Sequence, residues 1–190
     1  MAKKIKTRCE WVGDGPLMIA YHDKEWGKPV RDDVRLFEKL TLEGAQAGLS
    51  WATILKRREG YRKAFKKFDL KKISRFTDKD VERLLQDTGI IRNRLKVLSV
   101  INNARVVLEI QKEYGSFEEY IWGLAGGKVK KNRFRACKEI PATTPVSDLM
   151  SKALKKRGFK FIGPTCCYAF MQGVGMVNDH TVGCFRYDEV

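Results

Sequence analysis

Two histidines and two of the five cysteines are spaced so that they could bind a metal ion. His22 follows Cys9 by thirteen positions, and Cys184 follows His180 by four, a separation that puts both side chains on one face of a helix. Two thiolates and two imidazoles suit tetrahedral Zn²⁺, and four protein ligands would make the site structural. The spacing matches no local zinc-finger pattern, so hydrogen-bonded histidines and buried cysteines are an open alternative.

The other cysteines give no sign of a disulfide framework. The total is odd and the residues are scattered, and no apolar signal segment follows the basic residues 2–6. No apolar run approaches the roughly 20 residues that span a bilayer. We therefore expect reduced thiols or a metal site, no membrane contact and a cytoplasmic location.

A predicted pair of helices at about 78–108 could bind DNA phosphates. The segment 84–96 has a tight turn in which Gly89 is expected to adopt a left-handed conformation. Such a turn points backbone N–H groups outward at the start of the second helix, where the helix dipole favours an anion. An ordinary helical hairpin with solvated basic residues is the alternative. The expected DNA-binding residues here are Gly89, Ile90, Ile91, Arg92, Arg94 and Lys96.

The charge balance favours nucleic acid as the partner. Lysine and arginine total 38 against 23 acidic residues, which gives a formal charge of +15 and a pI near 9.7. A polyanion is then the first ligand to consider, although a merely basic protein would show the same balance. Contacts to phosphates carry no sequence information, so binding is expected to be non-specific and sensitive to salt.

The elements that must position these residues are helical nearly throughout. Apolar periodicity places Val34, Leu95, Leu98 and Leu149 on inward helix faces, and Ser147 is expected to cap a helix that ends at Gly158. The basic stretch 128–135 is interpreted as a mobile loop. Strand patterns, repeats and linkers are nearly absent, which predicts an all-α chain acting as one unit over 1–190, with two lobes possible and a basic tail at 1–8. The other helices are expected at 32–41, 50–68, 77–89, 95–108, 117–122 and 165–172.

Six segments in order resemble the 3-methyladenine DNA glycosylase I family. The resemblance runs from about Cys9 to Cys184, nearly the whole chain, and is weakest at the N-terminal tail and around 123–140. The segments that carry it are 8–12 (RCEWV), 21–27 (YHDKEWG), 42–51 (LEGAQAGLSW), the hairpin 84–96, 152–161 (KALKKRGFKF) and 175–180 (GMVNDH).

The resemblance implies a helix-hairpin-helix glycosylase fold and assigns the site residues. It implies that the four cysteine and histidine positions above hold one structural zinc ion joining the N- and C-terminal segments. Glu43 becomes the catalytic candidate, although its residue type alone would suggest a surface carboxylate. The aromatic residues that would otherwise be assigned to the core become base-binding candidates: Tyr21, Trp51, Trp11 and Trp26.

The activity implied is removal of 3-methyladenine from duplex DNA. We expect a monofunctional enzyme that leaves an abasic site, and we assume a monomer without an obligate protein partner. No aspartate lies between Asp87 and Asp148, and Lys96 is no clear lyase nucleophile. Leu49 is a candidate wedge for the gap left by the extruded base. The competing hypotheses are a non-catalytic zinc-containing helix-hairpin-helix DNA-binding protein and a lyase or endonuclease on the same fold.

Overall fold

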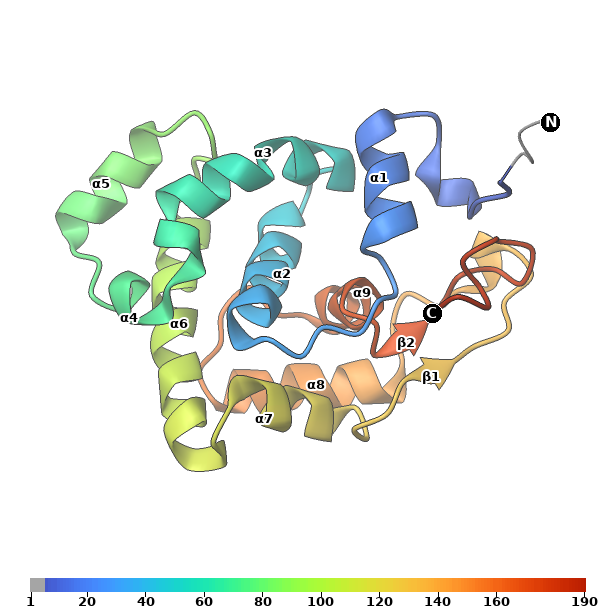
Figure 1. Ribbon diagram of the computed structural model, residues 1–190. Helices are drawn as coiled ribbons and strands as arrows, with labels where there is room; N and C mark the ends of the chain where they lie inside the picture. Colours follow the sequence, from blue (N-terminus) through green and yellow to red (C-terminus); the bar gives the residue numbers. More distant parts are fainter. Residues whose placement is uncertain (1–5) are drawn as a thin grey trace.

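A computed structural model describes residues 6–190, which form nine α-helices and two very short strands (Figure 1). The mostly helical architecture predicted from the sequence is confirmed. The helices are α1 Pro16–Lys24, α2 Asp33–Gln46, α3 Trp51–Ala64, α4 Leu70–Ile73, α5 Asp78–Gln86, α6 Arg94–Tyr114, α7 Phe117–Leu124, α8 Pro145–Lys156 and α9 Pro164–Gly173. The strands are β1 Lys130–Lys131 and β2 Val177–Asn178, and 3₁₀ turns occur at Glu10–Val12, Lys66–Phe68 and Cys137–Glu139.

The centre of the molecule is α2, which packs against α9, α3 and α6 (Figure 1). A large apolar core surrounds it, and a smaller one lies beside α1. Trp51 packs against both cores. The smaller core contains Cys9, Val12, Tyr21, Trp26, Leu55 and Cys184.

Most helix starts agree with the capping signals of the sequence. The Ser50 side chain accepts a hydrogen bond from the Thr53 amide, and Thr77 forms a capping box with Asp80. The assignment of Ser147 as a cap was wrong. Pro145 occupies the first helical position, so Thr144 caps α8 and the Ser147 hydroxyl accepts from the Thr144 amide.

Two inward positions predicted for α6 are exposed. Leu95 and Leu98 are 65% and 40% exposed, whereas Val97 and Ile101 are buried. Apolar residues lie on more than one face of this helix, and packing selects one of them. Val34 and Leu149 on other helices are also exposed instead of buried.

The basic stretch 128–135 is a loop except at Lys130–Lys131, which pair with the C-terminal segment, and its mobility stays a prediction. β1 pairs in parallel with β2, with Lys130 opposite Val177. The Asn132 amide continues the pairing with the Asn178 carbonyl at 3.1 Å. Each strand has only two residues, which is too few to produce an alternating strand pattern in the sequence.

The predicted tail at 1–8 is partly packed, and its residues 1–5 lie outside the described residues. The Thr7 carbonyl accepts from the Phe185 amide at 3.0 Å, and Arg8 pairs with Asp23. No helix within 6–190 combines the length and the apolar character needed to cross a membrane.

Candidate functional site

A cavity of about 340 Å³ brings together the four aromatic candidates and Glu43. Its walls come from both ends of the sequence, because α9 packs on α2 and α1 packs on α3. The residues that line it are Trp11, Tyr21, Trp26, Glu43, Gln46, Trp51, Cys137, Ile140, Ala169 and Gln172.

Glu43 is buried at the wall of this cavity, with 6% of its surface exposed. It lies on the third turn of α2, and its carboxyl makes no hydrogen bond or ion pair with any residue of 6–190. Burial raises the pKa of Glu43 to about 8, and the charge of Lys39 opposes that rise. At neutral pH the carboxyl of the free protein therefore holds its proton.

The positively charged Lys39 pairs with the Glu25 carboxylate and not with Glu43. Its ammonium lies 3.3 Å from Glu25, which also accepts two hydrogen bonds from Arg58. The same ammonium sits 4.5 Å from the centre of the Tyr21 ring. Burial lowers the pKa of Lys39. This network holds the Tyr21 ring against Lys39, and among residues 6–190 the Glu43 carboxyl at the cavity wall has no partner.

The aromatic rings are held at angles to one another. The Tyr21 and Trp51 ring centres are 5.4 Å apart, and those of Trp11 and Trp26 are 4.9 Å apart in an edge-to-face arrangement. The indole N–H of Trp51 is buried and has no acceptor within 6–190. A flat, electron-poor ring entering the cavity would meet aromatic surfaces.

Cys9, His22, His180 and Cys184 form a buried cluster with all four ligand atoms within 4.8 Å of one another. The Cys184 sulfur lies 3.4 Å from His22 Nε2 and 3.6 Å from His180 Nδ1, and the Cys9 sulfur lies 3.6 Å from His180 Nδ1. The sequence placed the last two residues of the cluster on a helix, which is wrong because they flank a turn. The cluster could hold one metal ion.

Both imidazoles are oriented through their other nitrogen. His22 Nδ1 lies 2.8 Å from Asp23, and His180 Nε2 lies 3.3 Å from the Trp26 carbonyl. The hydrogen bond from Arg8 lowers the pKa of Asp23 to about 2, so this carboxylate is charged at neutral pH. Such partners fix the ring orientation of metal-binding histidines. Since Trp26 also lines the cavity, the cluster supports that wall.

A wider groove of about 870 Å³ opens beside the cavity, and both share Glu43, Gln46 and Ala169. Leu49, the wedge candidate, lines the groove and is 38% exposed. Because the groove and the cavity share these three residues, a nucleic-acid strand lying in the groove would pass the opening of the cavity.

The hairpin between α5 and α6 is present, but Gly89 is not left-handed as predicted. The two glycines allow close packing instead: a Cβ on Gly89 would lie 3.3 Å from the Gly60 Cα of α3, and a Cβ on Gly60 would lie 2.1 Å from the Gly89 carbonyl oxygen. Tyr61 and Arg57 also anchor the turn, through the Ile91 amide and the Thr88 carbonyl.

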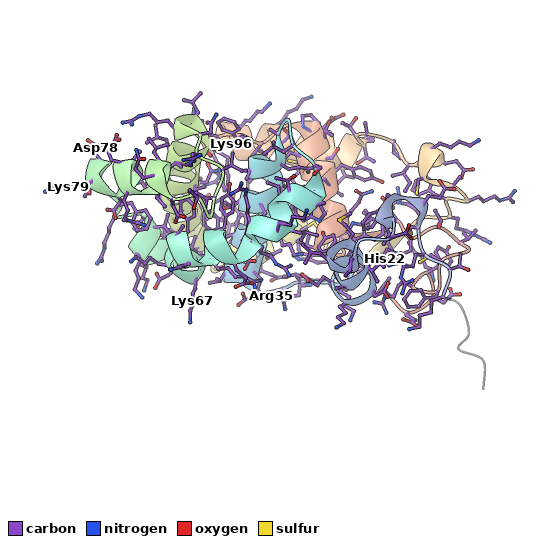
Figure 2. All side chains as sticks on the ribbon, turned by 90° about the horizontal axis from the view of Figure 1, so that it is seen from above. His22, Arg35, Lys67, Asp78, Lys79 and Lys96 are labelled. Carbon is purple, nitrogen blue, oxygen red and sulfur yellow. The ribbon has the colours of Figure 1, made fainter. Side chains whose placement is uncertain are left out.

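The basic residues of the hairpin differ in their surroundings. Arg92 is exposed, and Arg94 pairs with Glu82 at 2.6 Å on the surface. The Lys96 ammonium donates to the carbonyls of Ala45 and Ala47, each at 2.8 Å, at the C-terminal end of α2. Lys96 therefore ties the hairpin to the segment that carries Leu49. Figure 2 shows His22 and Asp78, the first residue of α5, toward opposite ends of the molecule.

Five residues of the cavity were missed from the sequence. Gln46 lies three positions after Glu43 on one helix, a spacing that signals a shared face. Gln172 donates to the buried Asp179 at 2.7 Å. Cys137, Ile140 and Ala169 come from segments with no chemical signal, and only the fold brings them here.

Comparison with known proteins gives one consistent result. The family model described as methyladenine glycosylase matches residues 11–187. The chain is 51% identical to the Escherichia coli (strain K12) protein named DNA-3-methyladenine glycosylase 1, over 95% of this chain and 96% of that one. A crystal structure of 3-methyladenine DNA glycosylase I superposes with a TM-score of 0.92 at 52% identity, covering 94% and 98% of the two chains. A variant of such an enzyme in complex with 3-methyladenine superposes with a TM-score of 0.91 at 34% identity, covering 94% and 96%.

Proposed function

The chain belongs to the methyladenine glycosylase family, and we propose that it hydrolyses the N-glycosidic bond of 3-methyladenine in alkylated DNA, releasing the free base and leaving an abasic site. The observation that carries the proposal is the cavity in which an unpaired, buried Glu43 faces four aromatic side chains. The relatives' names and the 3-methyladenine complex agree with it.

Hydrolysis of this glycosidic bond depends more on recognition of the damaged base than on acid catalysis. An adenine methylated on N3 is positively charged as a nucleoside and is already a good leaving group. The base must leave the stack before its bond is accessible, at a cost of a few kcal/mol that is smallest for damaged bases. In the cavity, Trp51 stacks on the base while Glu43 and Tyr21 contact its edge, with Trp11 and Trp26 closing the far wall.

Glu43 recognises the charge of the damaged base. With a pKa of about 8 it is neutral while the cavity is free, because an isolated carboxylate is disfavoured there. A cationic base restores the stability of the ionised form, so the carboxyl releases its proton to water as the base enters. A neutral adenine provides no such compensation, and this difference supplies selectivity for the alkylated base.

The buried cysteine and histidine cluster fits a structural Zn²⁺ ion. Tetrahedral zinc with two sulfur and two nitrogen ligands has ligand atoms about 3.5 Å apart, given Zn–S and Zn–N bonds of about 2.3 and 2.0 Å. The sulfur-to-nitrogen distances of 3.4 to 3.6 Å agree with this. The ion would cross-link the two ends of the chain. Cys9, His22, His180 and Cys184 would hold it.

Duplex DNA carrying the lesion is the proposed partner, bound by one monomer in the cytoplasm. The helix-hairpin-helix turn from Gly89 to Arg94 would contact phosphates, and Leu49 would enter the gap left by the base. The charge of +15 supports binding to a polyanion. The four-residue stretch 47–50 that carries Leu49 is exposed.

Release of free base from methylated duplex DNA tests the function. Under single-turnover conditions the wild-type protein is expected to release 3-methyladenine, and Glu43→Ala to lose roughly a hundredfold in rate or more. No release by a folded, DNA-binding wild-type protein would favour the non-catalytic alternative. A covalent adduct trapped with borohydride would contradict the monofunctional mechanism.

A further inference from the structure

Phe161, between α8 and α9, has a backbone conformation that a bulky residue rarely adopts. Its φ is +56°, in the left-handed region where a side chain with a Cβ is disfavoured. Most other residues with positive φ within 6–190 are glycines, and the remaining three form the single turn Lys66–Phe68. Strain of this kind persists only where the surrounding structure holds it in place, and it gathers at ligand-binding sites.

Three helices hold the segment around Phe161. The buried Asn103 side chain of α6 donates to the Lys160 carbonyl at 3.0 Å and accepts from the Lys160 amide at 2.9 Å. Ser151 of α8 donates to the Ile162 carbonyl at 3.2 Å. On α2, a Cβ at Gly44 would lie 3.2 Å from the Phe161 carbonyl oxygen, so the glycine permits the close approach.

This strain does not serve to bury the ring. Phe161 is 38% exposed, although the neighbouring Phe159 and Ile162 are each only 3% exposed. Phe161 is one of the residues that line the groove on which Leu49 also lies. Phe161 makes no aromatic pair with any residue of 6–190, so its exposed ring offers a surface for stacking at an open groove.

The charge and position of the groove select a DNA strand as its occupant. The extruded nucleotide stays covalently attached to its strand, so that strand must cross the mouth of the base cavity, which the groove adjoins through Glu43, Gln46 and Ala169. Of the described residues that line the groove, Glu43 at its shared wall is the only acidic one, and Lys155 adds positive charge. Lys160, beside Phe161, is exposed.

We propose that Phe161 is a DNA-contacting residue whose ring stacks on the nucleotide next to the extruded one in the damaged strand, within the groove shared with Leu49. The proposal rests on the proposed function, since it deepens the description of how that site holds its substrate. Bases offer a flat surface whatever their identity, so this contact would hold the strand without adding sequence preference.

Three variants separate a DNA contact from a structural role. Phe161→Gly removes the ring and suits the left-handed backbone, Phe161→Tyr keeps the ring, and Leu149→Ala removes an exposed apolar side chain of α8 outside the groove. The measurements are the Kd for a duplex with a tetrahydrofuran abasic-site analogue, the Kd for free 3-methyladenine from tryptophan fluorescence, and the melting temperature.

We expect Phe161→Gly to weaken binding of the abasic duplex by roughly 5- to 100-fold, with unchanged affinity for free 3-methyladenine. Phe161→Tyr and Leu149→Ala should stay within about twofold of the wild type. A Phe161→Gly protein that binds the duplex like the wild type, or a Phe161→Tyr protein that loses as much as Phe161→Gly, would overturn the proposal. Base release by the wild-type protein, measured alongside, tests the proposed function separately.

Discussion

Replacing Glu43 by glutamine should stabilise the protein by an amount that grows with pH. The unfolded chain releases the Glu43 proton near the ordinary pKa of 4.5, whereas the folded protein keeps it up to about 8. The folded state therefore binds more protons than the unfolded state between these values, and its stability falls as pH rises through this window. Below 4.5 the carboxyl is neutral in both states and costs nothing.

The magnitude follows from the width of that window. At pH 7, which is 2.5 pH units above 4.5, the burial of Glu43 costs about 3.5 kcal/mol at about 1.4 kcal/mol for each pH unit. At pH 5 the same reasoning gives about 1 kcal/mol. Glutamine has nearly the shape of the protonated glutamate and never ionises, so Glu43→Gln should be more stable by about these amounts.

Urea unfolding of the wild type and Glu43→Gln at pH 5 and pH 7 measures the two differences directly. Glu109→Gln on α6 is the matched control, because that side chain is exposed and its charge stays in water in both states. A stability gain in Glu43→Gln that is the same at both pH values would refute the reasoning. A loss of stability at pH 7 would show that the carboxylate has a favourable partner in the folded protein.

The remaining predictions concern the hairpin and the metal cluster. Lys96→Met should lower the free energy of unfolding by about 2 kcal/mol, since two charge-assisted hydrogen bonds to the end of α2 are lost; unchanged stability in urea would contradict this. If Lys96 also contacts a phosphate, the slope of log Kd against log salt should fall by about one in the same variant. Asp23→Ala should weaken zinc binding by roughly 10- to 100-fold in competition with a chelator, because His22 loses the carboxylate that orients it. Equal zinc affinity would show that the ring is oriented by its packing alone.

Function could be predicted in outline because several residue types are informative without coordinates. The chain has only two histidines, each near a cysteine, and this scarcity allowed the metal cluster to be proposed before the fold was known. The glutamate at 43 is different. Its residue type suggested the surface, and only the resemblance to a family placed it in a pocket, where the structure also has it.

The details that sequence reasoning missed depend on contacts between distant segments. Gly89 was assigned a left-handed turn, a local property, but its role is decided by Gly60 on another helix. The sequence predicts that Lys96 contacts a DNA phosphate, whereas its ammonium donates hydrogen bonds to two carbonyls at the end of α2, about fifty positions earlier in the chain. Side-chain chemistry indicates what a residue can bind, and packing selects its partner.

By itself the sequence determined the helical class, the basic charge and the residues that could bind metal, because periodicity, composition and ligand chemistry are properties of the chain alone. Tertiary structure decided which apolar face of α6 is buried, why Phe161 is strained and how far the pKa of Glu43 rises. These depend on what surrounds each group. Desolvation and close packing arise only when segments far apart in sequence exclude water from one another.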